Sequence, residues 1–193
     1  MSSFNAWYYR KMAIWSTLLK RDEMALEYWE RVRSLRPGDA QVVATISHLK
    51  AAGGNRREAI ALARQALELD PKRAAYWFNL GFLQQEEGEH EDALRSFERA
   101  IDLDEKLDRA WYGKALSLIK TGRVEEAVPL LKRNTELQPM SPFGWYQLAH
   151  AYHRLGQSER AAKVIRKLSE FEPQVARQLE RETGVAVGVD VPF

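Results

Sequence analysis

Apolar positions recur along this chain with helical spacing, and the same order of apolar, small and polar residues returns every 34 residues. The third copy of this order predicts two helices, at about 75–87 and 90–103, with a tight turn at Gly88 between them. Bulky apolar residues at helical spacing are expected to fill the space between the two helices: Trp77, Leu80, Leu94 and Phe97. The repeating unit is therefore predicted to be a helix–turn–helix pair.

Four kinds of residue carry the 34-residue period. Tryptophan recurs at Trp77, Trp111 and Trp145, and glycine recurs at Gly88, Gly122 and Gly156. Proline recurs at Pro37, Pro71, Pro139 and Pro173, and alanine recurs at Ala25, Ala59, Ala93, Ala127 and Ala161. Small residues such as alanine let two helices approach closely. Glycine tolerates the positive φ at which the first helix of each pair ends, and proline stops the second helix of the pair. We interpret these positions as structural and not as functional.

These residues resemble the tetratricopeptide repeat pattern. The last copy carries it as Trp145, Leu148, Ala149, Tyr152, Gly156, Ala161 and Pro173. The resemblance covers residues 6–175 and implies an all-α fold, a right-handed α-solenoid of five helix–turn–helix repeats. The repeats are expected at about 6–39, 40–73, 74–107, 108–141 and 142–175, within a single domain that spans residues 1–183.

The two ends of a solenoid expose apolar surface unless something covers it. Residues 174–182 predict a short capping helix that presents Val175 and Leu179 to the last repeat. An apolar tail, residues 184–193, follows it. Two interpretations of this tail are open: it frays, or it docks on a groove of its own chain or of a neighbouring one.

The fourth repeat departs from the pattern at two positions. Asn134 stands where alanine is expected, and Pro129 lies inside the second predicted helix. Structural drift and a functional kink are both open as explanations of the proline.

Composition and charge narrow the class of protein. The 193 residues are 45% hydrophobic and 29% charged with a net charge of +2, which is typical of a soluble globular chain and not of a nucleic-acid binder. The third repeat has nine carboxylates against three cations, which indicates a solvated face or a functional acidic surface. There is no cysteine, no secretory signal pattern and no apolar run of roughly 18 residues, so we expect a cytoplasmic protein without stable membrane insertion.

The resemblance also implies a binding groove, lined by the second, fifth, ninth, twelfth and thirteenth positions of each repeat. In the last three repeats these positions hold Phe78, Phe82, Arg109, Tyr112, Leu116, Lys120, Phe143, Tyr146, His150, His153 and Arg154. In the first two repeats they include Trp7, Arg10, Ile14, Ala44 and His48. Aromatic residues with scattered cations suit an apolar peptide or helix that carries some negative charge. The two-carboxylate clamp of some relatives is incomplete here, because only Asn79 and Arg109 match it.

No nucleophile, phosphate-loop or dinucleotide motif occurs, so we expect neither an enzyme nor a cofactor. His150 and His153 are three apart and could bind a metal, but with no evident third ligand we interpret them as groove residues. The leading hypothesis is a non-catalytic adaptor, scaffold or chaperone that binds a protein or peptide partner. The alternative is self-assembly through the tail or through the aromatic N-terminus, which contains Phe4, Trp7, Tyr8 and Trp15.

Overall fold

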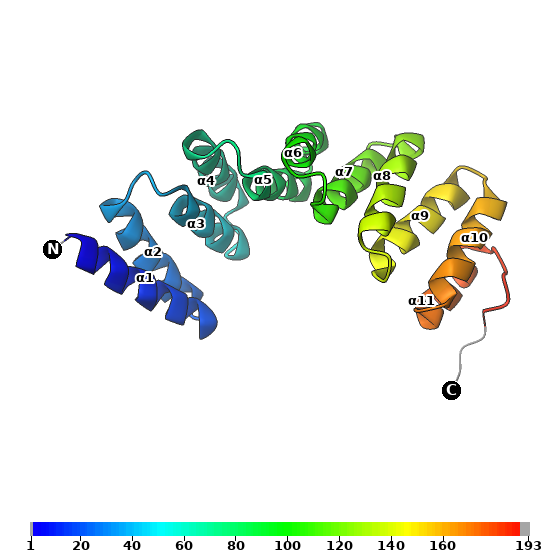
Figure 1. The fold of residues 1–193 in the computed structure, drawn as a ribbon, viewed down its shortest axis with the longest axis horizontal. Helices are drawn as coiled ribbons and strands as arrows, with labels where there is room; N and C mark the ends of the chain where they lie inside the picture. Colours follow the sequence, from blue (N-terminus) through cyan, green and yellow to red (C-terminus); the bar gives the residue numbers. More distant parts are fainter. Residues whose placement is uncertain (1, 190–193) are drawn as a thin grey trace. The chain divides into compact units, whose positions relative to one another are not determined.

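The structure is a computed structural model that describes residues 2–189. Every regular element in this range is an α-helix, so the predicted all-α class is confirmed (Figure 1). The helices are α1 Ser2–Leu18, α2 Asp22–Leu35, α3 Ala40–Ala52, α4 Arg56–Leu69, α5 Ala74–Glu86, α6 His90–Leu103, α7 Asp108–Lys120, α8 Val124–Leu137, α9 Pro142–Arg154, α10 Ser158–Ser169 and α11 Pro173–Thr183.

The helix boundaries reproduce the 34-residue period of the sequence. The odd-numbered helices from α3 to α9 begin 34 residues apart, at Ala40, Ala74, Asp108 and Pro142. The even-numbered helices from α2 to α10 also begin 34 residues apart, at Asp22, Arg56, His90, Val124 and Ser158. The period is therefore a period of helix pairs. The number of complete repeats, their handedness and the single-domain organisation stay predictions.

The turn inside each pair depends on a left-handed backbone conformation. Gly88 has a φ of 83°, and Gly54, Gly122 and Gly156 adopt a similar φ at the equivalent positions. Glycine carries no Cβ that would clash in this region, which explains why it recurs. In the first pair Lys20 takes the same place with a φ of 54°, so the turn survives although its glycine is missing.

The chain divides into two compact units, Met1–Glu89 and His90–Phe193. The first unit contains α1 to α5, and its core includes the buried side chains of Ala13, Val32, Ile46 and Ala66. The second unit contains α6 to α11, and its core includes the buried Leu131, Leu148, Ile165 and Leu168. Within residues 2–189, no helix has the length and apolar character needed to cross a bilayer.

The three periodic tryptophans are structural, as predicted. In each case the indole Nε1–H donates a hydrogen bond of 2.9 Å to the backbone carbonyl six residues earlier. The three acceptors are the carbonyl oxygens of Pro71, Glu105 and Pro139, which lie in the loops before α5, α7 and α9. Each tryptophan therefore fastens the start of its helix to the loop that precedes it.

Asn134 is a buried side chain that joins three helices of the second unit. It lies on α8, and its Nδ2 donates a 3.0 Å hydrogen bond to the carbonyl of Asp108 at the start of α7. Its Oδ1 points at Gly144 on α9, where a Cβ would lie only 2.2 Å away. The asparagine and the glycine therefore form a complementary pair. Helix α8 continues through Pro129 to Leu137.

The C-terminal cap forms close to the predicted boundaries, as α11, Pro173–Thr183. Leu179 is fully buried and Val175 is half-buried against the core of the second unit. The described part of the tail also docks, because Val185, Val187 and Val189 pack on the same core. In Figure 1 this segment leaves α11 as a red trace without helix. Residues 190–193, which the docking hypothesis also covered, lie outside the described residues.

A single carboxylate holds the tail. Glu180 Oε1 on α11 accepts hydrogen bonds from the backbone N–H groups of Val187, Gly188 and Val189, with N···O distances of 2.5, 2.8 and 3.4 Å. These bonds hold the pKa of the Glu180 carboxyl below its ordinary value of 4.5. The tail therefore returns to the helix from which it leaves.

Candidate functional site

The first unit contains a cleft of about 230 Å³ between α3 and α5. Ala44, Ala51, Phe82 and Leu83 are among its apolar lining residues. Polar groups stand around them: His48, Asn79, Arg56 and Glu86. Arg56 Nη2 and Glu86 Oε2 are 3.9 Å apart, so a loose ion pair crosses one side of the opening. Apolar surface with a few polar groups around it is the usual composition of a small binding site.

Small residues on α3 leave room for the cleft. Ala44, Ser47 and Ala51 follow one another at helical spacing on the side of α3 that lines it. The Ser47 hydroxyl is buried and donates a 2.7 Å hydrogen bond to the carbonyl of Ala59 on α4, which fixes α3 against α4. The serine therefore supports the cleft wall through the backbone of the next helix.

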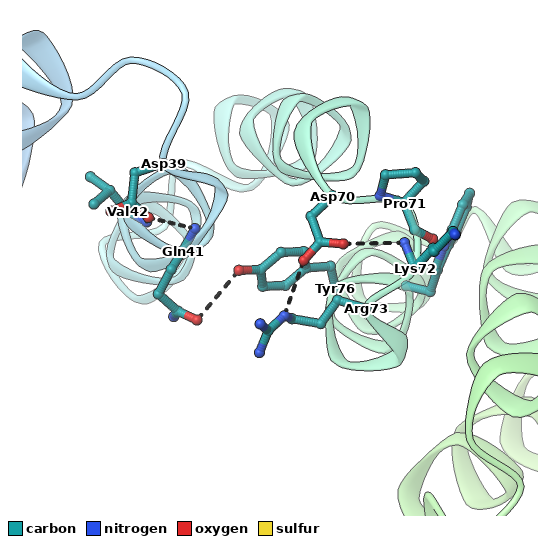
Figure 2. A network of polar contacts seen from close by, with 9 residues as sticks. Asp39, Gln41, Val42, Asp70, Pro71, Lys72, Arg73 and Tyr76 are labelled. Carbon is teal, nitrogen blue, oxygen red and sulfur yellow. Dashed lines mark hydrogen bonds and ion pairs between the residues drawn. The ribbon is translucent and has the colours of Figure 1, made fainter.

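A polar network positions α5 opposite α3, as Figure 2 shows. The Tyr76 hydroxyl on α5 donates a 3.3 Å hydrogen bond to Gln41 Oε1 on α3. Asp39 caps α3 by accepting from the backbone N–H groups of Gln41 and Val42. Burial raises the pKa of the Tyr76 hydroxyl, and the nearby Arg73 opposes this rise. The neutral hydroxyl is therefore favoured, and it keeps its role as a donor.

Asp70 organises the loop between α4 and α5 in the same view. Its carboxylate accepts 3.3 and 3.2 Å hydrogen bonds from Lys72 N–H and Arg73 Nε. The Arg73 guanidinium also lies over the Tyr76 ring, 5.5 Å from its centroid. This loop therefore fixes the direction in which α5 begins.

Only some of the groove residues predicted for the first unit lie together in the structure. Ala44, His48 and Phe82 line the cleft, and the rings of Phe82 and Phe78 stack with centroids 6.5 Å apart. The three α1 positions are not among the lining residues of this cleft: Trp7, Arg10 and Ile14. Arg10 instead lies 3.8 Å from Asp39 in an ion pair, while Trp7 and Ile14 are exposed.

In the second unit, two predicted groove residues on α9 hold a carboxylate from α11. Tyr146 Oη donates a 2.6 Å hydrogen bond to Glu182 Oε2, and His150 Nε2 lies 2.9 Å from the same oxygen. The two rings meet edge to face, with centroids 4.7 Å apart. Gln178 Nε2 donates to the other oxygen, Glu182 Oε1, at 2.7 Å.

These contacts separate the pKa values of the two partners. The bond to Glu182 raises the pKa of the Tyr146 hydroxyl to about 12. The hydroxyl of Tyr146, followed by the amide of Gln178, lowers the pKa of the Glu182 carboxyl to about 2. Both groups therefore stay in their hydrogen-bonded protonation states across the physiological range.

The remaining predicted residues of the second unit differ in exposure. Phe143 is 68% exposed, whereas Tyr112 and Leu116 are half-buried on α7. Burial raises the pKa of the Tyr112 hydroxyl, and a hydrogen bond with Gln147 opposes this rise. The predicted polar groove residues with exposed side chains are Arg109, Lys120, His153 and Arg154.

The sequence reasoning missed two groups of site residues. Arg56 lies outside the repeat positions assigned to the groove, whereas Glu86 occupies the thirteenth position of the third repeat but is not among the predicted residues; both line the cleft. Glu182 and Gln178 belong to the cap, for which only Val175 and Leu179 had been considered. The pattern of α11, with glutamine and glutamate four residues apart on one side, was the available signal. Across residues 2–189 there is no group of three or more metal-ligating side chains.

The paired helices and their 34-residue spacing define an α-helical repeat protein with protein-binding architecture. Two tetratricopeptide repeat profiles match the sequence, one over residues 60–176 and the other over residues 40–73. The first match spans more than half of the chain, so the chain belongs to the tetratricopeptide repeat family. No curated protein sequence matches it.

Solved structures share the fold. The crystal structure of MamA protein aligns with a TM-score of 0.79 at 18% identity, over 97% of this chain and 98% of that chain. MamA 41-end from Desulfovibrio magneticus RS-1 aligns with a TM-score of 0.82 at 19% identity, over 88% and 96%. YrrB, titled a TPR protein with an unusual peptide-binding site, gives 0.75 at 19% identity, over 90% of each chain. At these identities the likeness concerns the fold alone.

Proposed function

We propose that this protein is a non-catalytic adaptor, scaffold or chaperone-like protein that captures a segment of another protein. The α3–α5 cleft of the first unit is one contact site, and the α7 and α9 face of the second unit is the other. The observation that carries the proposal is the cleft of about 230 Å³, with Phe82 and small alanines lining it and His48 and Asn79 beside them.

The chemistry of the cleft suits a peptide. An apolar side chain fits against Phe82 and the alanines, while the Asn79 amide can both donate to and accept from a peptide backbone. Membership of the tetratricopeptide repeat family supports binding as the mode of action. Among the fold relatives, YrrB is described as a TPR protein with an unusual peptide-binding site.

Affinity capture from native lysate tests this proposal. A Phe82→Ala/Asn79→Ala variant should lose a partner that wild type retains, and a Tyr112→Ala/Tyr146→Ala variant should lose it as well. Met140→Ala serves as the control, because this side chain is 68% exposed in a loop outside both sites. Circular dichroism should show unchanged helical content in every variant. Equal capture by wild type and both double variants would refute the proposal.

Self-assembly is the second candidate, and the exposed face of α1 favours it. Four large apolar side chains of α1 are more than half exposed: Phe4 (67%), Trp7 (55%), Trp15 (60%) and Leu18 (68%). Their spacings of three, eight and three residues place them on one side of the helix. Exposed aromatic and apolar side chains on one side of a helix, here with the exposed Lys11 between Trp7 and Trp15, are typical of a protein interface. A second copy of the chain is the partner that this candidate requires.

Mass measurement in solution over a range of concentrations tests the second candidate. Wild type should form an oligomer that Trp7→Ala/Trp15→Ala converts to monomer. Phe143→Ala, which removes an even more exposed aromatic on α9, should leave the oligomer unchanged. A wild-type chain that is monomeric at every concentration contradicts self-assembly.

A further inference from the structure

We propose that Tyr146 and His150 form a carboxylate-binding site, which Glu182 occupies as a displaceable substitute for a carboxylate of the partner. This inference rests on the proposed function and defines the captured segment more closely. The segment carries an aspartate or glutamate next to apolar side chains.

The geometry of the donors supports this site. Tyr146 and His150 are one helical turn apart on α9, and both reach the same oxygen, Glu182 Oε2, at 2.6 and 2.9 Å. A hydroxyl and an imidazole N–H that converge on one oxygen are complementary to a carboxylate of any origin. The partner's carboxylate would therefore find two donors already placed by α9.

Glu182 can leave this position without undocking its helix. The side chain of Glu182 is 34% exposed. Its second oxygen bonds to Gln178 on the same helix, so this bond does not tie α11 to α9. The buried side chains of α11 are Ala176, Leu179 and Thr183, and Glu182 is not among them. A rotation of the glutamate side chain into solvent is thus enough to vacate the donors.

The charges on the predicted groove positions favour an acidic segment. Lys120 on α7 and Arg154 on α9 are both exposed, and neither makes an ion pair with any of the residues that the structure describes. Cations without an internal partner attract a negatively charged ligand and speed its association. The ion-pair partner of Glu182 is His150. When a carboxylate of the partner replaces Glu182, it contacts the same imidazole, so this group does not lose its partner.

Fluorescence anisotropy on the full chain tests the site. The probe is a short labelled peptide in which glutamates alternate with leucine and phenylalanine, and the matched probe has glutamine in place of each glutamate. Glu182→Ala should bind the acidic probe roughly five- to tenfold more tightly than wild type, because the two donors no longer have an internal competitor. Glu136→Ala is the control, since it removes an exposed carboxylate of the same unit that forms an ion pair with Arg133.

Two further measurements separate displacement from a general charge effect. The glutamine probe should gain no affinity from Glu182→Ala. Adding Tyr146→Phe to Glu182→Ala should cancel the gain, since it removes a donor and keeps the ring. The site is overturned if Glu182→Ala binds the acidic probe no more tightly than wild type, if the control gains equally, or if no variant binds that probe. Capture through the α3–α5 cleft would survive all of these results, so failure here is distinct from failure of the proposed function.

Discussion

Replacing Gly144 by alanine should destabilise the second unit, although alanine is the better helix former. An added Cβ would lie 2.2 Å from Asn134 Oδ1 and 3.1 Å from Thr135 Cγ2, so either the Asn134 side chain rotates and loses its bond to the Asp108 carbonyl, or α8 or α9 shifts. Overpacking of this kind costs about 1–3 kcal/mol, whereas the gain in helix propensity is at most about 1 kcal/mol. The expected net loss is therefore about 1–2 kcal/mol.

The second half of this prediction is a rescue. Asn134→Ala removes the clashing oxygen but also the bond from Nδ2 to the Asp108 carbonyl, which contributes about 1 kcal/mol. The double variant, Gly144→Ala/Asn134→Ala, should be within about 1 kcal/mol of wild type. The two substitutions are then coupled by about 1–2 kcal/mol, as expected for residues in contact.

Thermal unfolding followed by far-ultraviolet circular dichroism measures these differences, and about 1 kcal/mol corresponds to a change of about 2–4 °C in Tm. Gly38→Ala is the control, because no atom lies within 4 Å of the Cβ it would add. This control should match wild type or exceed it slightly. The packing argument fails if Gly144→Ala is as stable as wild type, or if the double variant loses the sum of the two single losses.

Three further predictions concern the second unit. Gly113→Ala should lower Tm in the same assay, because its Cβ would lie 2.5 Å from Cζ of the buried Phe97 ring. Glu180→Ala should release the tail, seen as faster amide hydrogen exchange there; unchanged exchange would contradict the carboxylate clamp. The Tyr146–Glu182 bond should stabilise the fold fully between pH 4.5 and 10. That contribution is lost as pH falls toward 2, where the depressed pKa of Glu182 lies, or rises toward 12, where the raised pKa of Tyr146 lies. Thermal unfolding of Tyr146→Phe should lack the alkaline effect and show a smaller acid effect, because Gln178 and His150 still lower the pKa of Glu182.

The helix pairs could be predicted from the sequence because each structural role is repeated. Trp77, Trp111 and Trp145 make the same bond to the same loop position, so three independent copies report one contact. The loop acceptor is a backbone carbonyl, which explains why Glu105 can replace the expected proline without loss of the bond. Repetition therefore identifies contacts whose partner is the backbone or another repeated residue.

Contacts that occur only once in the chain cannot be identified by comparing repeats. In the periodic pattern Asn134 is only a departure from the expected alanine, yet it is matched by Gly144 in the following repeat. The periodic comparison aligns each residue with its equivalents and not with its neighbours in space. A departure that is compensated by a second departure is therefore invisible until the two helices are placed together.

In the candidate sites, too, some features are shared by the repeats and others occur only once. The groove positions of Phe82, Tyr146 and His150 are implied by the family resemblance, which carries over to each repeat because the helix face on which a residue lies is periodic. What each side chain meets there is not periodic. Glu182 belongs to a cap that occurs once, and Arg56 reaches the cleft from a helix whose equivalents were assigned no groove position. Binding specificity within such a fold resides in these unrepeated side chains, since a residue common to every repeat cannot distinguish one part of a partner from another.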